Sequence, residues 1–306
     1  MAYDLTKFTD FIGRENEVLT STLFAGGDTA KIARYMTGIK GSTEVPKISG
    51  KANIQKGTCN TPNGATAGDL VKISVEPFTV YESFCQDDLQ TKFPNMVLAP
   101  GSNNADTPKE WEEALIEVKI SDIAEQMELL YWQGDTTGTD HTLFDGFLKK
   151  IDDAGAINGN TSNATEITID NVKQLVEDMR TAAPAKVKRH KDFTIAVGDD
   201  IFDLFLQAEK RDNLYHYKPE HDEGTYRIGG SGATLQRVYG LDGKSRMVAT
   251  IKHNLIIGSD VENEEAVADM WYDKTSDLTY FRVKAKAGVQ IDNATNEIVE
   301  FTLSAE

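Results

Sequence analysis

The chain has 306 residues, of which 26% are charged and 40% are hydrophobic, and its formal net charge at pH 7 is -17. This composition is typical of a globular protein and excludes a wholly disordered or fibrous chain. Because affinity for nucleic acid comes mostly from neutralising phosphates, such a negative chain is not a general DNA- or RNA-binding module.

Compartment and redox state follow from two further features. No apolar run approaches eighteen residues, so we expect no membrane-spanning helix. The first residues lack the basic and apolar regions of a signal peptide, so we expect the protein to stay in the compartment where it is made. The chain has two cysteines, Cys59 and Cys85. We interpret them as free thiols in a reducing compartment.

Residues 1–43 predict an N-terminal arm. The stretch from Arg14 to Tyr35 is mostly compatible with a helix but is interrupted by Gly26 and Gly27. Its apolar residues do not form a full core-facing stripe. An arm of this kind needs a partner surface to lie on.

Residues 44–80 predict an extended hairpin. The stretch 71–75 alternates apolar and polar residues, as a half-exposed strand does. The stretch 56–64 is dense in turn residues and predicts the tip. The apolar content of this hairpin is too thin to bury both of its faces within one subunit.

Residues 81–137 predict a peripheral domain built on a long helix. Thr107 and Glu110 form a capping box around Pro108, and Gly134 ends the helix. At 1.5 Å per residue the helix is roughly 38 Å long, which suits a strut. Two neighbouring apolar stripes place Leu115 and Ile123 toward the interior of the subunit.

Residues 138–262 alternate helix and strand patterns and predict a mixed α/β domain. The helices are expected after Asp170 and over 199–212. Strands are expected at 193–197, 247–251 and 255–257, and residues 213–234 are expected to form an irregular loop. Residues 263–292 predict a long peripheral hairpin. Residues 293–306 predict a final strand that returns to the α/β domain.

A search for catalytic chemistry finds no convincing cluster. His216 and His221 lie near Asp222 and Glu223 in the predicted loop, and we favour a solvated loop there over a metal site. The segment Gly240–Ser245 ends like a phosphate loop but has two residues between its glycines where four are needed. We interpret 241–244 as a β-turn. The sequence therefore predicts neither an enzyme nor a cofactor or metal site.

The order of these elements resembles the major capsid protein of tailed bacteriophages (Caudoviricetes), which has the Hong Kong 97 type shell fold. Phe78–Leu89 looks like the strand that leaves the extended loop of that family, and Glu113–Asp135 is similar to the end of its spine helix. Leu143–Phe147 looks like the entry to the axial domain. The helix, strand and helix at 170–179, 193–197 and 199–212 follow the order found in the family. The likeness lies in the order and spacing of the predicted helices and strands across nearly the whole chain.

The resemblance implies an α+β Hong Kong 97-like capsid fold with an N-terminal arm, an extended β-hairpin loop, a long spine helix, a peripheral domain and a mixed α/β axial domain. It implies a major capsid protein that self-assembles into pentamers and hexamers, forms an icosahedral head around phage double-stranded DNA without sequence-specific binding, and resides in the virion after assembly in the host bacterial cytoplasm. The arm begins almost at Met1, so we expect a separate scaffolding protein, or a scaffolding segment that has been removed. A portal and decoration proteins are the other expected partners.

The resemblance also places contacts between subunits at the hairpin and at the axial loop. The candidate residues are Lys51, Lys56, Thr58, Asn60, Pro62, Tyr215, His216, Tyr217, His221, Asp222 and Glu223. Two alternatives stay open: an encapsulin-type bacterial shell, which packs enzymes, and a cytoplasmic enzyme with an unrecognised site near His216 and His221.

Overall fold

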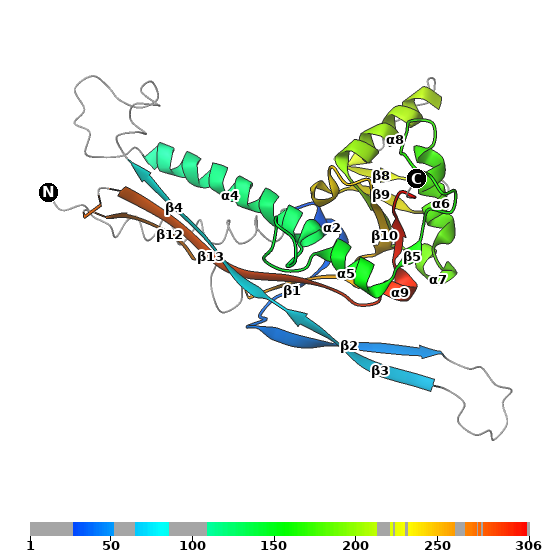
Figure 1. The fold of residues 1–306 in the computed structure, drawn as a ribbon, viewed down its shortest axis with the longest axis horizontal. Helices are drawn as coiled ribbons and strands as arrows, with labels where there is room; N and C mark the ends of the chain where they lie inside the picture. The colour runs from blue at the N-terminus through cyan, green and yellow to red at the C-terminus, as the bar shows by residue number, and fades with distance from the viewer. Residues whose placement is uncertain are drawn as a thin grey trace.

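The structure is a computed structural model that describes residues 27–51, 65–85, 109–212, 221–222, 224–229, 232–260, 267–273, 275–276 and 278–304. Its described strands form a five-stranded sheet, a seven-stranded sheet and a separate two-stranded hairpin. Helices accompany both larger sheets, so the molecule is of the α+β class (Figure 1).

The five-stranded sheet is built around one long strand, β13 (Leu278–Ile291). Along one edge β13 pairs antiparallel with β11 (Leu255–Ser259) and β12 (Val267–Asp273), and along the other with β4 (Glu76–Cys85). A short strand, β1 (Arg34–Met36), runs parallel to β11. The antiparallel pair β12–β13 confirms the long hairpin predicted near the C-terminus.

Helix α4 (Lys109–Gln133) lies along one face of this sheet (Figure 1). Its buried residues Ile120, Ile123 and Met127 share a core with Phe281 and Val283 of β13. The predicted inward orientation of Ile123 is confirmed. The side chain of Leu115 lies outside the described residues.

The seven-stranded sheet has the order β5 (Ile157–Asn158), β14 (Val299–Phe301), β10 (Met247–Ile251), β6 (Phe193–Val197), β9 (Thr234–Arg237), β8 (Thr225–Arg227) and β7 (His221–Asp222). Helices α6 (Val172–Ala182) and α8 (Asp199–Asp212) bury their apolar faces in a core shared with this sheet. The strand at 193–197 and the helices expected on either side of it are therefore confirmed. Strand β14 pairs with β10, as expected of a closing strand.

Shorter elements complete the described chain. Helix α5 (Phe147–Ala154) follows the spine helix, α7 (Ala185–Lys188) follows α6, and α9 (Ala294–Glu297) precedes β14. Two 3-10 turns, η1 (Tyr239–Leu241) and η2 (Lys252–Asn254), flank β10. Residues 1–43 were expected to form an arm, but α2 (Thr29–Ile32) and β1 belong to the body of the subunit, because Ile32 is buried in its core and β1 pairs with β11.

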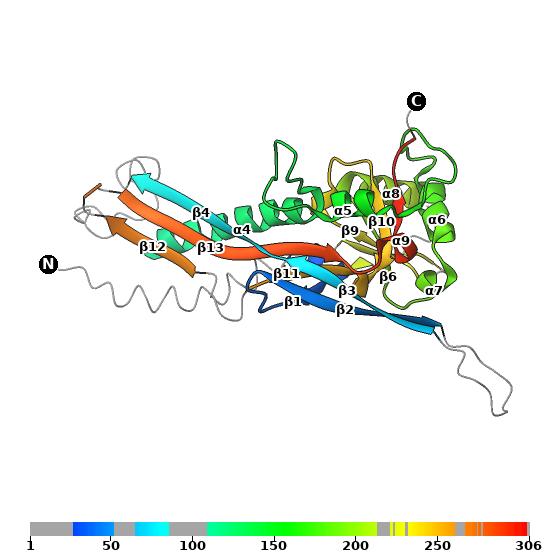
Figure 2. The same ribbon diagram turned by 60° about the horizontal axis from the view of Figure 1, so that its bottom comes forward.

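The hairpin predicted at 44–80 is present as β2 (Ser42–Lys51) and β3 (Ala65–Ser74), which pair antiparallel over ten residues each. Both views show it extending away from the two larger sheets (Figures 1 and 2). The sequence prediction carried the hairpin to residue 80. In the structure the hairpin pairing ends at Ser74, and β4 begins at Glu76 within the five-stranded sheet.

Two expectations for residues 138–262 are corrected. Residues 255–257 were expected in the α/β domain, but β11 pairs with β13 and β1 in the five-stranded sheet. Asn254 fixes this change of sheet, because its side chain accepts from Asn293 N at 2.6 Å and donates to Asn293 O at 3.1 Å. The region 213–234 was expected to be irregular, yet its described part contains β7, β8 and the first residue of β9.

Candidate assembly surfaces

The root of the β2–β3 hairpin is fixed to the five-stranded sheet. Only Val75 separates β3 from β4, and its amide donates to Gly41 O at 2.8 Å. The buried side chains at the root are Val45, Ile73 and Val75, which pack with Ile39 and Ile256. The hairpin therefore continues from the strand β4, and the hydrophobic core formed by its described side chains lies at its base.

Polar contacts and close backbone packing reinforce this root. Lys47 Nζ donates to Asp292 O at 2.8 Å, and Gln290 Nε2 donates to Lys72 O at 2.6 Å. A Cβ atom added at Gly288 would overlap the carbonyl oxygen of Ser74, so glycine allows the strands to approach there. The direction in which the hairpin projects is consequently set by the body of the subunit.

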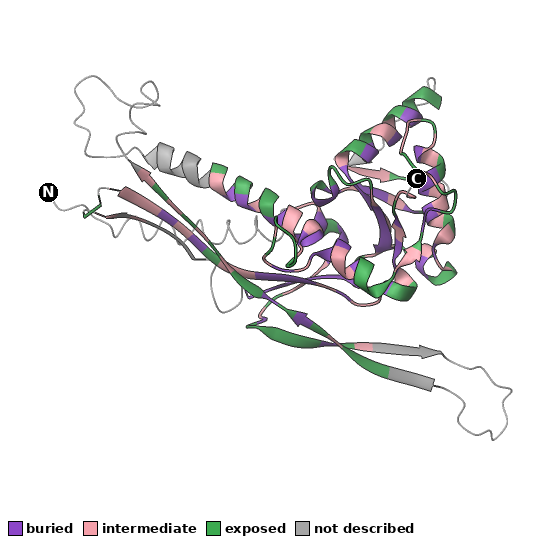
Figure 3. Cartoon of the chain, in the orientation of Figure 1, coloured by how far each residue is buried: buried purple, intermediate pink, exposed green. Residues whose placement is uncertain are grey.

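Beyond its root, the described part of the hairpin is mostly exposed (Figure 3). Gly68, Asp69 and Leu70 on β3 and Pro46 on β2 are exposed, and Leu70 is 58% accessible. Among the described strands, β2 and β3 pair only with each other. An isolated two-stranded hairpin is at best marginally stable in water, and its outer edges offer free backbone groups. These features fit a segment that is completed by another surface.

A second exposed surface lies on the five-stranded sheet, on the face opposite α4. Tyr81 of β4 stacks with Tyr280 of β13 at 5.5 Å between ring centroids, and Trp271 of β12 stacks with Tyr280 at 5.6 Å. The Arg282 guanidinium lies 5.1 Å from the Trp271 ring centroid. Neighbouring residues on a strand point to opposite faces, and Phe281 is buried toward α4. Tyr81 is 56% exposed.

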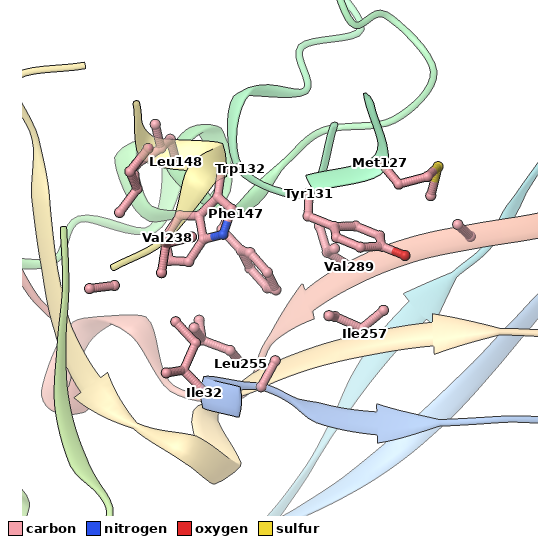
Figure 4. Close-up of a cluster of buried hydrophobic side chains, with 14 of the residues drawn as sticks. Ile32, Met127, Tyr131, Trp132, Phe147, Leu148, Val238, Leu255, Ile257 and Val289 are labelled. Carbon is pink, nitrogen blue, oxygen red and sulfur yellow. The ribbon is translucent and has the colours of Figure 1, made fainter. Parts of the chain in front are cut away.

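The arm, the spine helix and both sheets meet in one buried cluster. Trp132 of α4 and Phe147 of α5 pack edge to face at 5.3 Å, with Ile32 of α2 and Leu255 of β11 beside them (Figure 4). Gln133 Nε2 also donates to Gly240 O in η1 at 2.9 Å. This cluster joins elements that are far apart in the sequence.

The structure describes few of the contact residues that the sequence singled out. Lys51 is the last residue of β2, paired with Ala65, and His221 and Asp222 form the edge strand β7. The following predicted contact residues lie outside the described residues: Lys56, Thr58, Asn60, Pro62, Tyr215, His216, Tyr217 and Glu223. The contacts predicted at the hairpin tip and at the axial loop stay predictions.

The described residues contain no group of three or more His, Cys, Asp or Glu side chains placed to hold a metal ion. In the same part of the chain, no helix is both long and apolar enough to cross a membrane. The amide of Lys244 donates to Leu241 O at 3.1 Å, which confirms the β-turn predicted in place of a phosphate loop.

Sequence reasoning missed the aromatic face of the five-stranded sheet. The signal was present, because Tyr280 alternates with buried Phe281 and so falls on the other face of the strand. The register that brings Tyr81 and Trp271 to Tyr280 depends on long-range pairing, which alternation within one strand does not reveal.

Comparison with known proteins gives a match in structure and none in sequence. No family model matches the chain, and no curated protein matches it. The capsid of the native GTA particle is similar with a TM-score of 0.62 and 14% identity, covering 91% of this chain and 90% of that one. A chain of the cyanophage A-1(L) capsid has a TM-score of 0.58 and 11% identity, covering 95% and 94%.

A third similar structure is the satellite phage P4 procapsid including size determination (Sid) protein, with a TM-score of 0.56 and 13% identity. The match covers 94% of this chain and 99% of that one. These likenesses span nearly the whole chain and confirm the Hong Kong 97-like α+β fold that the order of elements predicted.

Proposed function

We propose that this chain is a major capsid protein that assembles into the icosahedral head shell of a tailed bacteriophage. The observation that carries the proposal is the β2–β3 hairpin, which is packed against the five-stranded sheet at its base and is mostly exposed at its other described side chains. This feature occurs in a chain whose whole fold matches capsid chains. A segment that cannot bury its own surface gains stability from a neighbouring copy.

The proposed arrangement assigns a place to each part of the chain. The domain at 138–254, with the returning residues 293–306, surrounds the five- and six-fold axes of pentamers and hexamers. The peripheral parts, 76–137 and 255–292, meet at the three-fold and two-fold contacts. Residues 1–26 of the arm and the hairpin at 42–74 lap neighbouring subunits.

The proposed contact residues follow this arrangement. Lys51, Lys56, Thr58, Asn60 and Pro62 touch a neighbour at the hairpin tip. The loop residues gather at the centre of the capsomer, and they are Tyr215, His216, Tyr217, His221, Asp222 and Glu223.

The remaining parts of the proposal concern the content and partners of the shell. The net charge of -17 keeps its inner surface from adhering to the enclosed double-stranded DNA. A separate scaffolding protein and a portal act during assembly in the host cytoplasm, decoration proteins bind the finished shell, and the product resides in the virion. The role is structural and needs no cofactor.

The capsid structures named above favour this function over its alternatives. An encapsulin-type compartment would share the shell but contain enzymes, so DNA inside particles from infected cells distinguishes the two. An enzyme would give a small oligomer. Negative-stain microscopy and light scattering of the purified chain test the proposal, which predicts capsomers or shells and is wrong if only a small compact oligomer forms.

Deleting residues 50–66 tests the role of the hairpin directly. The deletion removes the tip and leaves the root residues Val45 and Ile73 in place. We expect a folded subunit by circular dichroism that fails to assemble by sedimentation. Normal shells from the deleted protein would contradict the proposed contact.

A further inference from the structure

The carboxyl group of Glu128 lies at the joint between the spine helix α4 and helix α2. Its side chain is buried, and the residue is only 6% exposed. Thr29 N donates to Glu128 Oε1 at 3.3 Å, and the Thr29 hydroxyl donates to Oε2. Trp132 Nε1 in turn donates to Thr29 Oγ1 at 2.8 Å. A single carboxyl group thus holds the start of α2 through both donors of Thr29.

The joint leaves little space around this carboxyl group. A Cβ atom added at Gly27 would overlap Glu128 Oε1, so the chain entering α2 passes directly over the carboxyl. Gly240 of η1 also packs closely against Trp132 and the backbone oxygen of Glu128, and an added Cβ atom there would overlap both. An ionised carboxylate enclosed in this way loses most of its hydration.

The groups around Glu128 do not offset this loss. Asp28 and Lys31 of α2 have opposite effects, since the first disfavours and the second favours ionisation. Tyr131 of α4 and Tyr35 of β1 have raised pKa values, mainly through burial, with Glu128 a smaller cause. The ionisable side chain of η1, Tyr239, is 40% exposed. Lys31, the basic residue of α2, pairs with Asp28 instead, at 3.1 Å between Nζ and Oδ1.

We propose that Glu128 is a proton-controlled latch that holds α2 against the spine helix when its carboxyl is protonated and loosens when it ionises. Undocking of α2 would expose the carboxyl to water, where ionisation has its ordinary free energy. The docked state therefore binds the proton more tightly, and raising the pH shifts the equilibrium toward release.

The expected pH window follows from the same burial. Burial raises the pKa of Glu128 from 4.5 to about 7, against the opposing hydrogen bonds from Thr29. Docking is then strongest below pH 4.5 and weakens between pH 4.5 and 7. Above that range the loss reaches a plateau on the order of a hundredfold in the docking equilibrium.

The latch lies where residues 1–26 join the described body of the subunit. Its opening would free the base of the arm for contacts with neighbouring copies, a consequence that rests on the proposed shell function. The latch itself is a property of one subunit. The latch proposal can therefore be wrong while the proposed shell function is right, and the shell function can be wrong while the latch exists.

Hydrogen exchange of the full-length, dispersed protein tests the latch. Peptides covering residues 28–35 are compared between the wild type and Glu128→Gln at pH 5.5, 7.0 and 8.5, so that the intrinsic pH dependence of exchange cancels in the ratio. We expect the wild type to be about tenfold less protected than Glu128→Gln at pH 5.5, and on the order of a hundredfold less protected at pH 8.5. Glu125→Gln, which removes an exposed carboxylate one turn away, should behave as the wild type.

A ratio between wild type and Glu128→Gln that does not change with pH would overturn the latch. A second measurement covers the case in which the glutamine variant does not fold. The carboxyl carbon of Glu128 in the wild-type protein, followed by NMR, should titrate with a midpoint near 7. A midpoint near the ordinary value of 4.5 would overturn the proposal by itself.

Discussion

The seven-stranded sheet and the β2–β3 hairpin differ in how they bury their apolar side chains. The sheet shares a continuous core with α6 and α8, in which Ile195, Leu235 and Phe301 are fully buried. Each strand of the hairpin has ten residues, yet among its described side chains the buried ones lie at the root.

This difference separates the residues that stabilise the subunit from those that act in assembly. Side chains in the sheet domain stabilise the subunit, because their burial is complete within one chain. Side chains along the hairpin add little to the isolated subunit and gain their burial from another surface. Substitutions in the two regions should therefore affect different measurements, and four predictions test this separation.

The largest effect is expected on the spine helix. Ile123→Asp places an unpaired charge in the layer between α4 and the five-stranded sheet, and should lower the free energy of unfolding by about 5 kcal/mol. Soluble yield and thermal unfolding measure this loss. The control is Val118→Asp on the same helix, which is 57% exposed and should be nearly neutral. Similar losses in both variants would show that the inward face of α4 is misassigned.

The second largest effect on stability is expected in the seven-stranded sheet. Phe193→Ala on β6 removes a side chain that is 1% exposed, and should lower the free energy of unfolding by about 3–5 kcal/mol. Chemical denaturation of the dispersed subunit measures it. A loss below about 1 kcal/mol would mean that this domain does not carry the stability of the subunit.

A smaller effect is expected at the root of the hairpin. Gly288→Ala forces β13 away from Ser74, and should cost about 1–3 kcal/mol. Gly68→Ala on the exposed part of β3 is the matched control, because a Cβ atom there meets no atom within 4 Å. Thermal unfolding of the two variants compares them. If the two variants are equally stable, the boundary between the body of the subunit and the hairpin does not lie at Gly288.

The smallest effect on subunit stability is expected along the hairpin itself. Leu70→Ala should change the free energy of unfolding by less than about 0.5 kcal/mol while reducing assembly measured by sedimentation. Ile73→Ala, three residues further along the same strand and fully buried, should instead cost about 2–4 kcal/mol. If Leu70→Ala destabilises the dispersed subunit as strongly as Ile73→Ala, the contrast between hairpin and root fails.

Several elements could be predicted because their signals are local. The stripe of α6 at Val172, Leu175, Val176 and Met179 is visible as helical spacing, and all four residues are buried. Ile123 was assigned to the interior by the same periodicity. The hairpin followed from alternation in β3 and from turn residues between the strands. The order of these elements was sufficient to indicate the capsid fold.

Other features depend on partners that are distant in the chain. Strand β11 is buried at every position, so its pattern predicts a central strand without indicating which sheet it joins. Strands β7 and β8 are two and three residues long, too short for a periodic signal. In the sequence, Glu128 does not differ from the other acidic residues of α4, because only the packing of α2 and η1 encloses it.

The sequence by itself determined the longer elements, their order and the apolar faces of helices such as α6, because these depend on spacing within a few turns or one strand. The tertiary structure decided which sheet receives β11, how Tyr81, Trp271 and Tyr280 come to stack, and how the hairpin is rooted. It also decided the environment of Glu128. Those outcomes depend on register and burial between residues up to 245 positions apart, which local periodicity does not encode.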